Sequence, residues 1–236
     1  MTRFGLVAAL ALLLAGCREP GRVDARDYDA FWLWGGVAPQ PVLEHARTLY
    51  LLEGEVRDGE PVHYASLRAS PRLEGKEVWL VVRTDTLRWP EGAYRAVIAR
   101  LEQWRAGGND LQGLQVDFDA RTKHLGDYAA FLADLRRRLP KGYRLSITGL
   151  LDWSAHGDPE ALRVLRGTVD EVVVQTYQGR ETIPGYDDYF DRMKGFDLPF
   201  RVGIIQGGRW IEPARLRRNP SFRGYVVFLT NSKRGS

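Results

Sequence analysis

Residues 111–120 read L-Q-G-L-Q-V-D-F-D-A, and this stretch indicates the fold most strongly. In an extended chain, successive side chains point to opposite faces. An apolar face then carries Leu114, Val116 and Phe118, and a polar face carries Gln115, Asp117 and Asp119. An isolated half-buried strand would turn these carboxylates to water. Here, however, the flanking strand and helix patterns alternate, which predicts a parallel sheet covered on both faces. We therefore expect Asp117 and Asp119 to project into a mouth or crevice, where such folds bind ligands.

Eight short apolar runs that end in polar or glycine residues are predicted strands. They are residues 30–36, 48–56, 77–84, 111–119, 143–151, 171–177, 200–206 and 224–230, and residues 62–67 extend the second into a hairpin. Helical patterns occupy 93–106, 125–139, 159–165 and 186–194, and we expect six or seven helices in all. This order predicts an α/β fold, a single small and compact (β/α)8 TIM-type barrel. An open doubly wound sheet is the alternative, but no glycine-rich phosphate loop supports it.

Polar and aromatic side chains gather at the carboxyl ends of most predicted strands. Because a barrel builds its site at that end, they are the predicted substrate-binding residues. The set is Trp32, Trp34, Glu53, Arg83, Gln115, Asp152, Gln175 and Gln206. Buried, unpaired charges are costly, so structural stability alone does not readily explain this pattern. Tryptophan and tyrosine at such positions are suited to stacking on sugar faces, although Trp32 is also typical of a core residue.

Two of these strands resemble motifs of a known enzyme family. Residues 113–119, G-L-Q-V-D-F-D, resemble the fourth-strand motif of glycoside hydrolase family 18, the chitinase-like barrels. Residues 174–177, V-Q-T-Y, resemble the sixth-strand motif of that family. Asp119 stands where that family has glutamate, and Gln115 and Gln178 stand where it has aspartate. The chain as a whole resembles bacterial lipoproteins of domain-of-unknown-function family 3142, a group with glycosidase-like barrels.

The resemblance implies glycoside hydrolysis, with Asp117, Asp119 and Tyr177 as the predicted catalytic residues. That reaction needs a protonated carboxylic acid beside the leaving oxygen and a second group at the anomeric carbon. We expect Asp119 to be the acid and Asp117 to raise its pKa through like-charge repulsion. Tyr177 and Gln175 would hold a hydroxyl or acetamido group of a polysaccharide. The alternative is a degenerate barrel that binds a glycan or a protein without cleaving it.

Other chemistries find less support in the sequence. A metal site would need histidines near the carboxylates, but the four histidines fall in predicted helices or loops: His45, His63, His124 and His156. No nucleophile elbow indicates a Ser-His-Asp hydrolase. We therefore predict no metal and no cofactor. No nucleic-acid-binding motif is present, and we expect a monomer.

The N-terminus carries a predicted export signal. Arg3 is followed by an apolar run at 6–15, too short to span a bilayer as a mature helix, and then by Leu-Ala-Gly-Cys17. This ending resembles the lipobox of bacterial lipoproteins, in which the cysteine after the cleavage site is lipidated. The alternative is an ordinary cleavage site with a coincidental cysteine. Arg18, rather than an aspartate, favours the outer membrane, facing the periplasm.

The remaining organisation follows from length, composition and charge. Residues 1–17 are the predicted signal peptide, 18–29 a polar tether and 30–236 the barrel domain. Cys17 is the single cysteine, so the lipidated chain would have no disulfide. The formal net charge is +4, and arginine runs such as 136–138 fall on predicted helices or loops. A solvated surface explains them, and binding to anionic glycans or lipid headgroups is the alternative.

Overall fold

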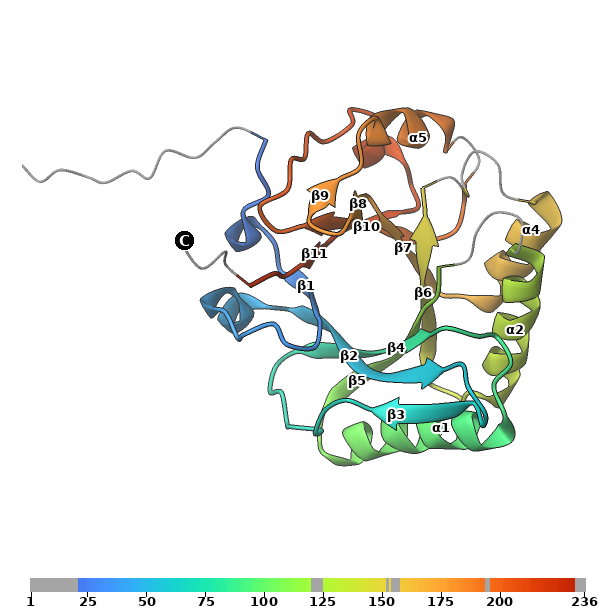
Figure 1. Ribbon diagram of the computed structural model, residues 1–236. Helices are drawn as coiled ribbons and strands as arrows, with labels where there is room; N and C mark the ends of the chain where they lie inside the picture. The colour runs from blue at the N-terminus through green and yellow to red at the C-terminus, as the bar shows by residue number, and fades with distance from the viewer. Residues whose placement is uncertain (1–20, 120–124, 152, 154–157, 194–195, 232–236) are drawn as a thin grey trace, which may run out of the picture.

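The computed structural model describes residues 21–119, 125–151, 153, 158–193 and 196–231. Within them, eight parallel strands form a closed barrel, seen along its axis in Figure 1. The strands are β1 (Ala30–Leu33), β2 (Thr48–Arg57), β4 (Glu77–Thr84), β5 (Asp110–Asp117), β6 (Arg144–Leu150), β7 (Glu171–Gln175), β10 (Phe200–Ile205) and β11 (Phe222–Phe228). Because β1 pairs with both β2 and β11, the sheet has no free edge in the barrel. The predicted TIM-type barrel is confirmed, and the open sheet is excluded.

The described part of the chain has fewer α-helices than the six or seven helices predicted. The described residues form four α-helices, which are α1 (Glu91–Ala106), α2 (Leu125–Arg138), α4 (Pro159–Thr168) and α5 (Tyr186–Arg192). Short 3₁₀ helices stand in the β1–β2 and β10–β11 connections, at Pro41–His45 and Leu216–Arg218. The β2–β4 connection instead holds β3 (His63–Ser66), which pairs antiparallel with β2. The described residues therefore reach the expected six or seven helices only when the short 3₁₀ helices are counted with the α-helices.

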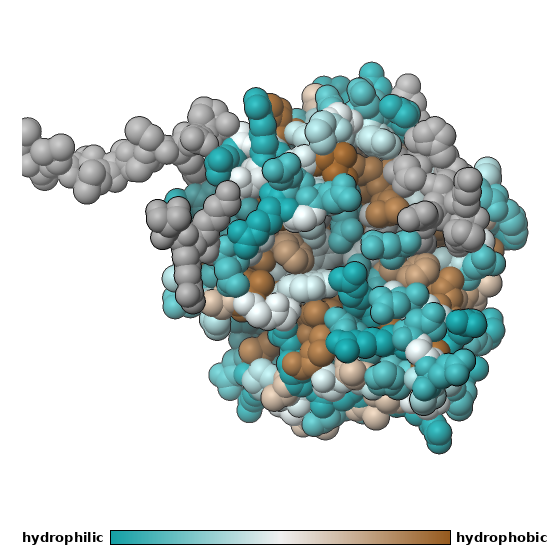
Figure 2. Space-filling model, in the orientation of Figure 1, coloured by the Kyte–Doolittle hydropathy of each residue, from teal (hydrophilic) through white to brown (hydrophobic). Residues whose placement is uncertain are grey.

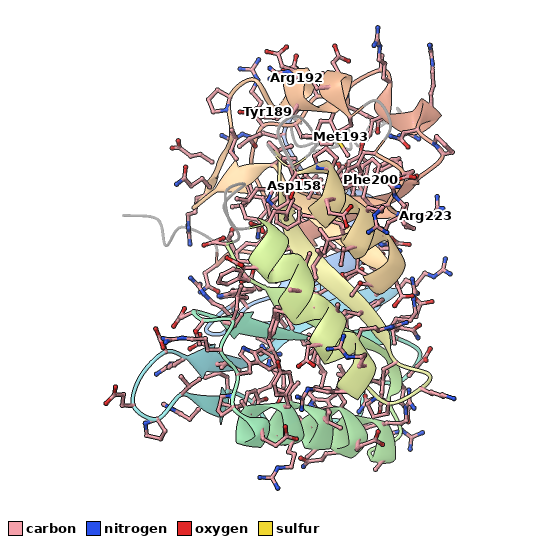
Figure 3. The ribbon with its side chains drawn as sticks, turned by 90° about the vertical axis from the view of Figure 1, so that its right-hand side faces the viewer. Asp158, Tyr189, Arg192, Met193, Phe200 and Arg223 are labelled. Atoms are coloured by element: carbon pink, nitrogen blue, oxygen red, sulfur yellow. The ribbon has the colours of Figure 1, made fainter. Side chains whose placement is uncertain are left out.

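Local sequence explains where the helices begin and end. Asp158 accepts a hydrogen bond from the Glu160 backbone N–H at 3.1 Å, which caps the start of α4. Past the end of α1, Gly108 has a φ of 82°, a conformation that favours glycine. In side view, α2 and α4 lie next to each other over the outer face of the strands (Figure 3). In the same view Phe200 and Arg223, near the starts of β10 and β11, lie toward one end of the barrel.

Two apolar clusters make the core. The larger one fills the space between the strands and the outer helices, and includes Leu114, Val116 and Phe131. The smaller one fills the barrel interior, where the rings of Tyr50 and Trp79 stack at 5.8 Å. Because side chains fill the interior, a ligand reaches the strands only from the ends of the barrel.

The N-terminal segment packs on the barrel earlier than expected. Residues 21–29 were predicted to belong to the tether, but Val23 exchanges two backbone hydrogen bonds of 2.9 Å with Gly207 and Gly208. Val23 and Ala25 are buried, which gives this segment an apolar anchor on the barrel. The short strands β8 (Tyr177–Gln178) and β9 (Glu181–Thr182) form a separate hairpin. No helix among the described residues is long and apolar enough to cross a membrane.

Candidate functional site

Asp117 is the last residue of β5 and lies at the carboxyl end of the barrel. Its side chain is buried, and its Oδ1 accepts a hydrogen bond of 2.9 Å from the Thr148 hydroxyl on β6. Arg83 on β4 is its register partner across the sheet. A pocket of about 290 Å³ opens here, lined by Arg83, Thr84, Asp85, Asp117, Phe118 and Asp119. Figure 2 shows this end of the barrel, where hydrophilic and hydrophobic residues together surround a hollow.

The electrostatics of this pocket centre on Asp117. The pKa of its carboxyl is raised to about 6, mainly by burial and to a smaller extent by the charge of Asp119. The Thr148 hydrogen bond and the charge of Arg83 oppose that rise. The sequence led us to expect the raised pKa on Asp119, through like-charge repulsion. In the structure the pKa of Asp117 is raised, and burial is a larger cause than like-charge repulsion.

Asp119 and Arg83 occupy the open side of the pocket. Asp119 follows the end of β5 by two residues and is exposed to solvent. Arg83 is also exposed, and it makes no ion pair with another described residue. Phe118 points the other way and packs against Tyr128 of α2 at 5.2 Å between ring centroids. The predicted alternation of polar and apolar faces therefore extends to the pocket.

Tyr177 approaches the same region from another strand. The predicted sixth strand ends at Gln175, so Tyr177 belongs to the β8–β9 hairpin, where its ring packs against Phe228 at 5.4 Å. Its hydroxyl is buried without a hydrogen-bond partner in the described residues. Burial and the charge of Asp117 raise its pKa well above the ordinary value. Gln175 lies near the Tyr177 hydroxyl and opposes part of this rise in pKa. Its amide nevertheless makes no hydrogen bond of normal geometry to that hydroxyl.

Trp32 and Gln115 lie below the pocket, in the barrel interior. The indole N–H of Trp32 donates to Gln115 Oε1 at 2.6 Å, and Gln115 Nε2 donates to the Ser146 hydroxyl at 2.9 Å. Both side chains are at most 1% exposed, so neither is open to a sugar. They were predicted as substrate-binding residues, and the structure instead places them in the packed interior. Trp34, two residues further along the chain than Trp32, is only half-buried and packs against Phe228.

Glu53 faces away from the barrel mouth, contrary to our expectation. It lies on β2 and shares the outward parity of Leu49 and Leu51, next to an irregularity in the β2–β4 register. Its carboxylate accepts hydrogen bonds from Arg100 at 2.5 Å and from the Trp104 indole at 3.0 Å, both on α1. The side chain is fully buried under that helix. Glu53 therefore attaches α1 to the barrel, which is a structural role.

Three other predicted residues lie elsewhere. The Gln206 amide bonds to Gln40 at 2.7 Å and accepts from the Thr230 backbone N–H at 2.9 Å, which ties two loops together. Asp152 and Cys17 lie outside the described residues. Conversely, sequence reasoning did not select Thr148 as a site residue. Its hydroxyl on the inward face of β6 was a signal for a carboxylate partner.

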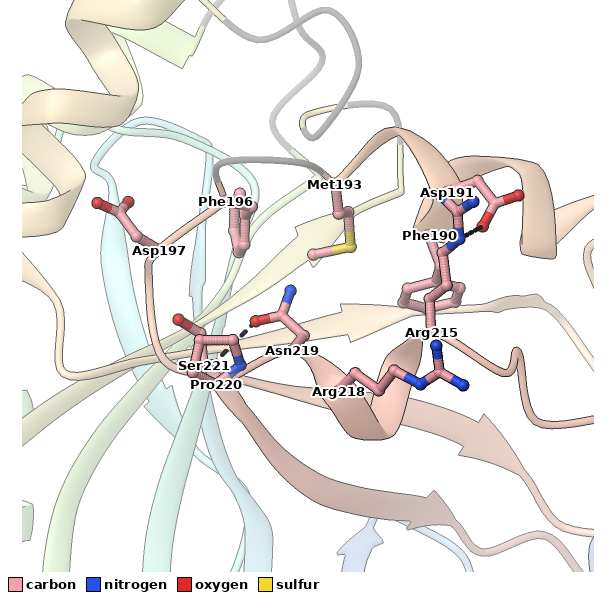
Figure 4. Close-up of a pocket in the computed structure, with 10 residues that line it drawn as sticks. All are labelled: Phe190, Asp191, Met193, Phe196, Asp197, Arg215, Arg218, Asn219, Pro220 and Ser221. Atoms are coloured by element: carbon pink, nitrogen blue, oxygen red, sulfur yellow. Dashed lines mark hydrogen bonds and ion pairs between the residues drawn. The ribbon is translucent and has the colours of Figure 1, made fainter.

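A larger pocket, of about 580 Å³, lies at the opposite end of the barrel (Figure 4). It opens between the segments that precede β10 and β11, and it includes Phe190, Met193 and Phe196. Arg215 and Asp191 form an ion pair of 3.8 Å at its rim. Since barrel enzymes place their chemistry at the carboxyl ends of strands, this pocket is a weaker candidate despite its size. None of the described predicted site residues lines it.

Comparisons with known proteins place the fold. The family model "Domain of unknown function (DUF3142)" matches residues 75–198, and no curated protein matches the chain. The chain is similar to the Bacillus cereus spore cortex-lytic enzyme SleL, with a TM-score of 0.50 and 18% identity over 75% of this chain and 49% of that one. It thus spans about half the length of SleL.

Two further solved structures cover more of their own length. The chitinase domain of the Clostridium difficile spore coat protein CotE has a TM-score of 0.52 and 14% identity, over 87% of this chain and 72% of that one. The tamarind chitinase-like lectin has a TM-score of 0.52 and 12% identity, over 85% and 94%. At these identities the likeness concerns the fold alone, which is that of chitinase-like barrels.

Proposed function

The chain belongs to the DUF3142 family, and on that premise we propose that it acts on a polysaccharide by hydrolysing a glycosidic bond. The observation that carries this proposal is the pair of carboxyl groups at the carboxyl end of β5. Asp117 is buried with a pKa of about 6, and Asp119 is exposed in the same pocket. Barrel enzymes place their reacting groups at this end.

The two carboxyl groups suit different steps of the reaction. Asp119 is open to solvent and is therefore the group that can contact the glycosidic oxygen as general acid. Asp117 takes up a proton near pH 6 and lies with Asp119 in the same pocket, where it is proposed to be the electrostatic partner of the acid. The positive charge of Arg83 favours the ionised form of Asp117 and so opposes the rise in its pKa. We therefore propose Asp119 as the general acid and Asp117 as its electrostatic partner.

Tyr177 and Gln175 are proposed to hold the sugar. A buried hydroxyl without a partner is unfavourable in the free protein, since it has lost its hydrogen bonds to water. A ligand hydroxyl or acetamido oxygen that reached Tyr177 would satisfy it. Trp34 is half-buried and packs against the interior apolar cluster, as Tyr177 does. It is the remaining aromatic candidate for stacking on a sugar ring.

A glycan-binding protein without turnover is the second candidate function. Asp119 is one methylene shorter than the glutamate that chitinase-like enzymes carry at that position, which favours binding over cleavage. The tamarind protein shows that a chitinase-like barrel can be a lectin. Turnover separates the two candidates.

We also propose that the protein is anchored in the cell envelope through a lipid on Cys17. The support is the sequence Leu-Ala-Gly-Cys17 after an apolar run. The proposed location is the outer membrane, on the side that faces the periplasm. A monomer is proposed, because the closed barrel leaves no strand of its ring unpaired.

The test is turnover on a panel of polysaccharides, with products detected by mass. Because general-acid catalysis typically contributes about 10²–10⁴-fold, Asp119→Asn should reduce turnover by that order and leave glycan affinity near wild type. Asp119→Glu should retain or increase activity. Asp110→Asn is the matched control, since Asp110 is exposed at the opposite end of the same strand. Glycan binding with no cleavage by any variant would establish the lectin alternative instead.

A further inference from the structure

The N-terminal segment joins the barrel at one defined place, beside the loop that follows β10. The Trp210 backbone N–H donates to the Gly21 carbonyl at 2.6 Å, and Arg22 forms a β-bridge with Arg209. A Cβ placed on Gly21 would lie 3.6 Å from Ile211 Cγ1. The chain that leads to Cys17 therefore starts next to Ile211.

Ile211 is unusual in its exposure. It is 62% exposed, and Leu67, at 43%, is the only other large apolar side chain that is exposed in the described part of the chain. Its backbone is nevertheless held firmly, because the Tyr186 hydroxyl accepts from the Ile211 N–H at 2.7 Å and donates to its carbonyl at 2.8 Å. The Tyr186 ring also stacks on Trp210 at 4.5 Å. The fold thus keeps the Ile211 side chain exposed to solvent.

The surroundings of Ile211 combine apolar side chains with charged ones at the edge. A pocket of about 450 Å³ adjoins it, with Ile183, Pro184 and Pro213 among its apolar lining residues. Two acidic residues also line it, Asp187 and Glu212, and Glu212 is paired with Arg217. Arg209 lines the same pocket, is exposed, and makes no ion pair within the described residues. We call Ile183, Pro184, Arg209, Ile211 and Pro213 the anchor face. An apolar surface with an unpaired guanidinium is suited to the headgroup region of a bilayer, where the cation meets lipid phosphate.

Chain length sets how far this face can be from the lipid. Three residues separate Cys17 from Gly21, so their Cα atoms are at most about 14 Å apart even in a fully extended chain. A lipidated Cys17 lies at the membrane surface. A spacer this short holds the anchor face against the headgroups. The inference rests on the proposed lipidation of Cys17.

We propose that the barrel docks on the phospholipid surface through the anchor face, with its polar pocket turned away from the membrane. The strand order places the two sites on opposite sides of the ring. The anchor face adjoins β10 and β11, and the pocket adjoins β4 and β5. Two strands separate these pairs in each direction around the barrel, β7 and β6 one way and β1 and β2 the other. The pocket therefore lies across the ring from the anchor face.

Depth-sensitive fluorescence quenching on the full lipidated protein tests this orientation. The protein is reconstituted into vesicles of phosphatidylethanolamine and phosphatidylglycerol that contain a brominated phosphatidylcholine, which quenches tryptophan on contact. Ile211→Trp adds a reporter to the anchor face. Leu67→Trp is the matched control, because Leu67 is also apolar and exposed but follows β3, on the side of β2 and β4. The fluorescence of each added tryptophan is taken as the difference between the variant and the wild-type protein.

We expect the added tryptophan of Ile211→Trp to lose at least about half of its intensity, and that of Leu67→Trp to stay unchanged. Equal quenching at both positions, or none at position 211, overturns the docking proposal. Should Ile211→Trp fail to fold, Arg209→Trp reports on the same face. A protein that does not attach to the vesicles refutes the Cys17 anchor, and the docking proposal with it. Attachment without the expected difference refutes only the docking.

Discussion

Replacing Asp117 with asparagine tests whether the polar pocket costs the protein stability. Burial raises the pKa of this carboxyl from about 3.8 to about 6. A difference of about 2 in pKa corresponds to about 3 kcal/mol between the charged and neutral forms. Because the folded pKa is the higher one, folding takes up a proton between about pH 4 and pH 6. The contribution of Asp117 is therefore most favourable below pH 4 and is lost as the pH rises through 6.

Asp117→Asn should accordingly stabilise the protein at neutral pH and have little effect in acid. The amide is uncharged, has nearly the same shape, and can still accept the Thr148 hydrogen bond. Loss of the attraction to Arg83 reduces the gain, so we expect about 1–3 kcal/mol at pH 8 and close to zero at pH 4. For a domain of this size that gain is roughly 2–10 °C in Tm.

The assay is thermal and urea unfolding of wild type and Asp117→Asn at pH 4, 6 and 8, followed by circular dichroism. The quantity of interest is the difference between the two proteins at each pH, since other groups also titrate. Asp110→Asn serves as the control, because its exposed carboxylate should give a small difference at every pH. A gain of equal size at pH 4 and pH 8, or a loss at pH 8, would refute the reasoning.

Three further predictions concern single side chains. Glu53→Ala leaves Arg100 and the Trp104 indole without their buried acceptor, so unfolding experiments should show a loss of about 3–5 kcal/mol, and a loss below 1 kcal/mol would contradict the structural role. Tyr177→Phe removes a hydroxyl that has no hydrogen-bond partner among the described residues, so the free energy of unfolding should change by less than about 0.5 kcal/mol. Glycan affinity measured by calorimetry should fall several-fold, and an unchanged affinity would show that the hydroxyl contacts no ligand. Cys17→Ala should release the protein from membranes with its circular dichroism spectrum unchanged, whereas continued sedimentation with membranes would argue against the lipid anchor.

Local pattern in the sequence determined the barrel and the position of its principal carboxylates. The predicted strand at 77–84 coincides with β4, because a continuous run of apolar residues identifies a strand buried on both faces. Alternation placed Leu114 outside and Gln115 inside the barrel, and the structure agrees. The carboxyl at position 117 follows from the same period of two. These features depend on neighbours a few residues apart, which a sequence displays directly.

Tertiary structure decided which of these polar residues are accessible. Gln115 and Asp117 have the same parity, but barrel closure buries the first beneath Trp32 and leaves the second at the edge of a pocket. Glu53 was expected near a strand end as Arg83 is, yet it lies within β2 and turns outward, where α1 supplies it with an arginine and an indole. The raised pKa of Asp117 likewise depends on how much protein surrounds it. Accessibility and desolvation are set by residues distant in sequence, and only the packed barrel brings those together.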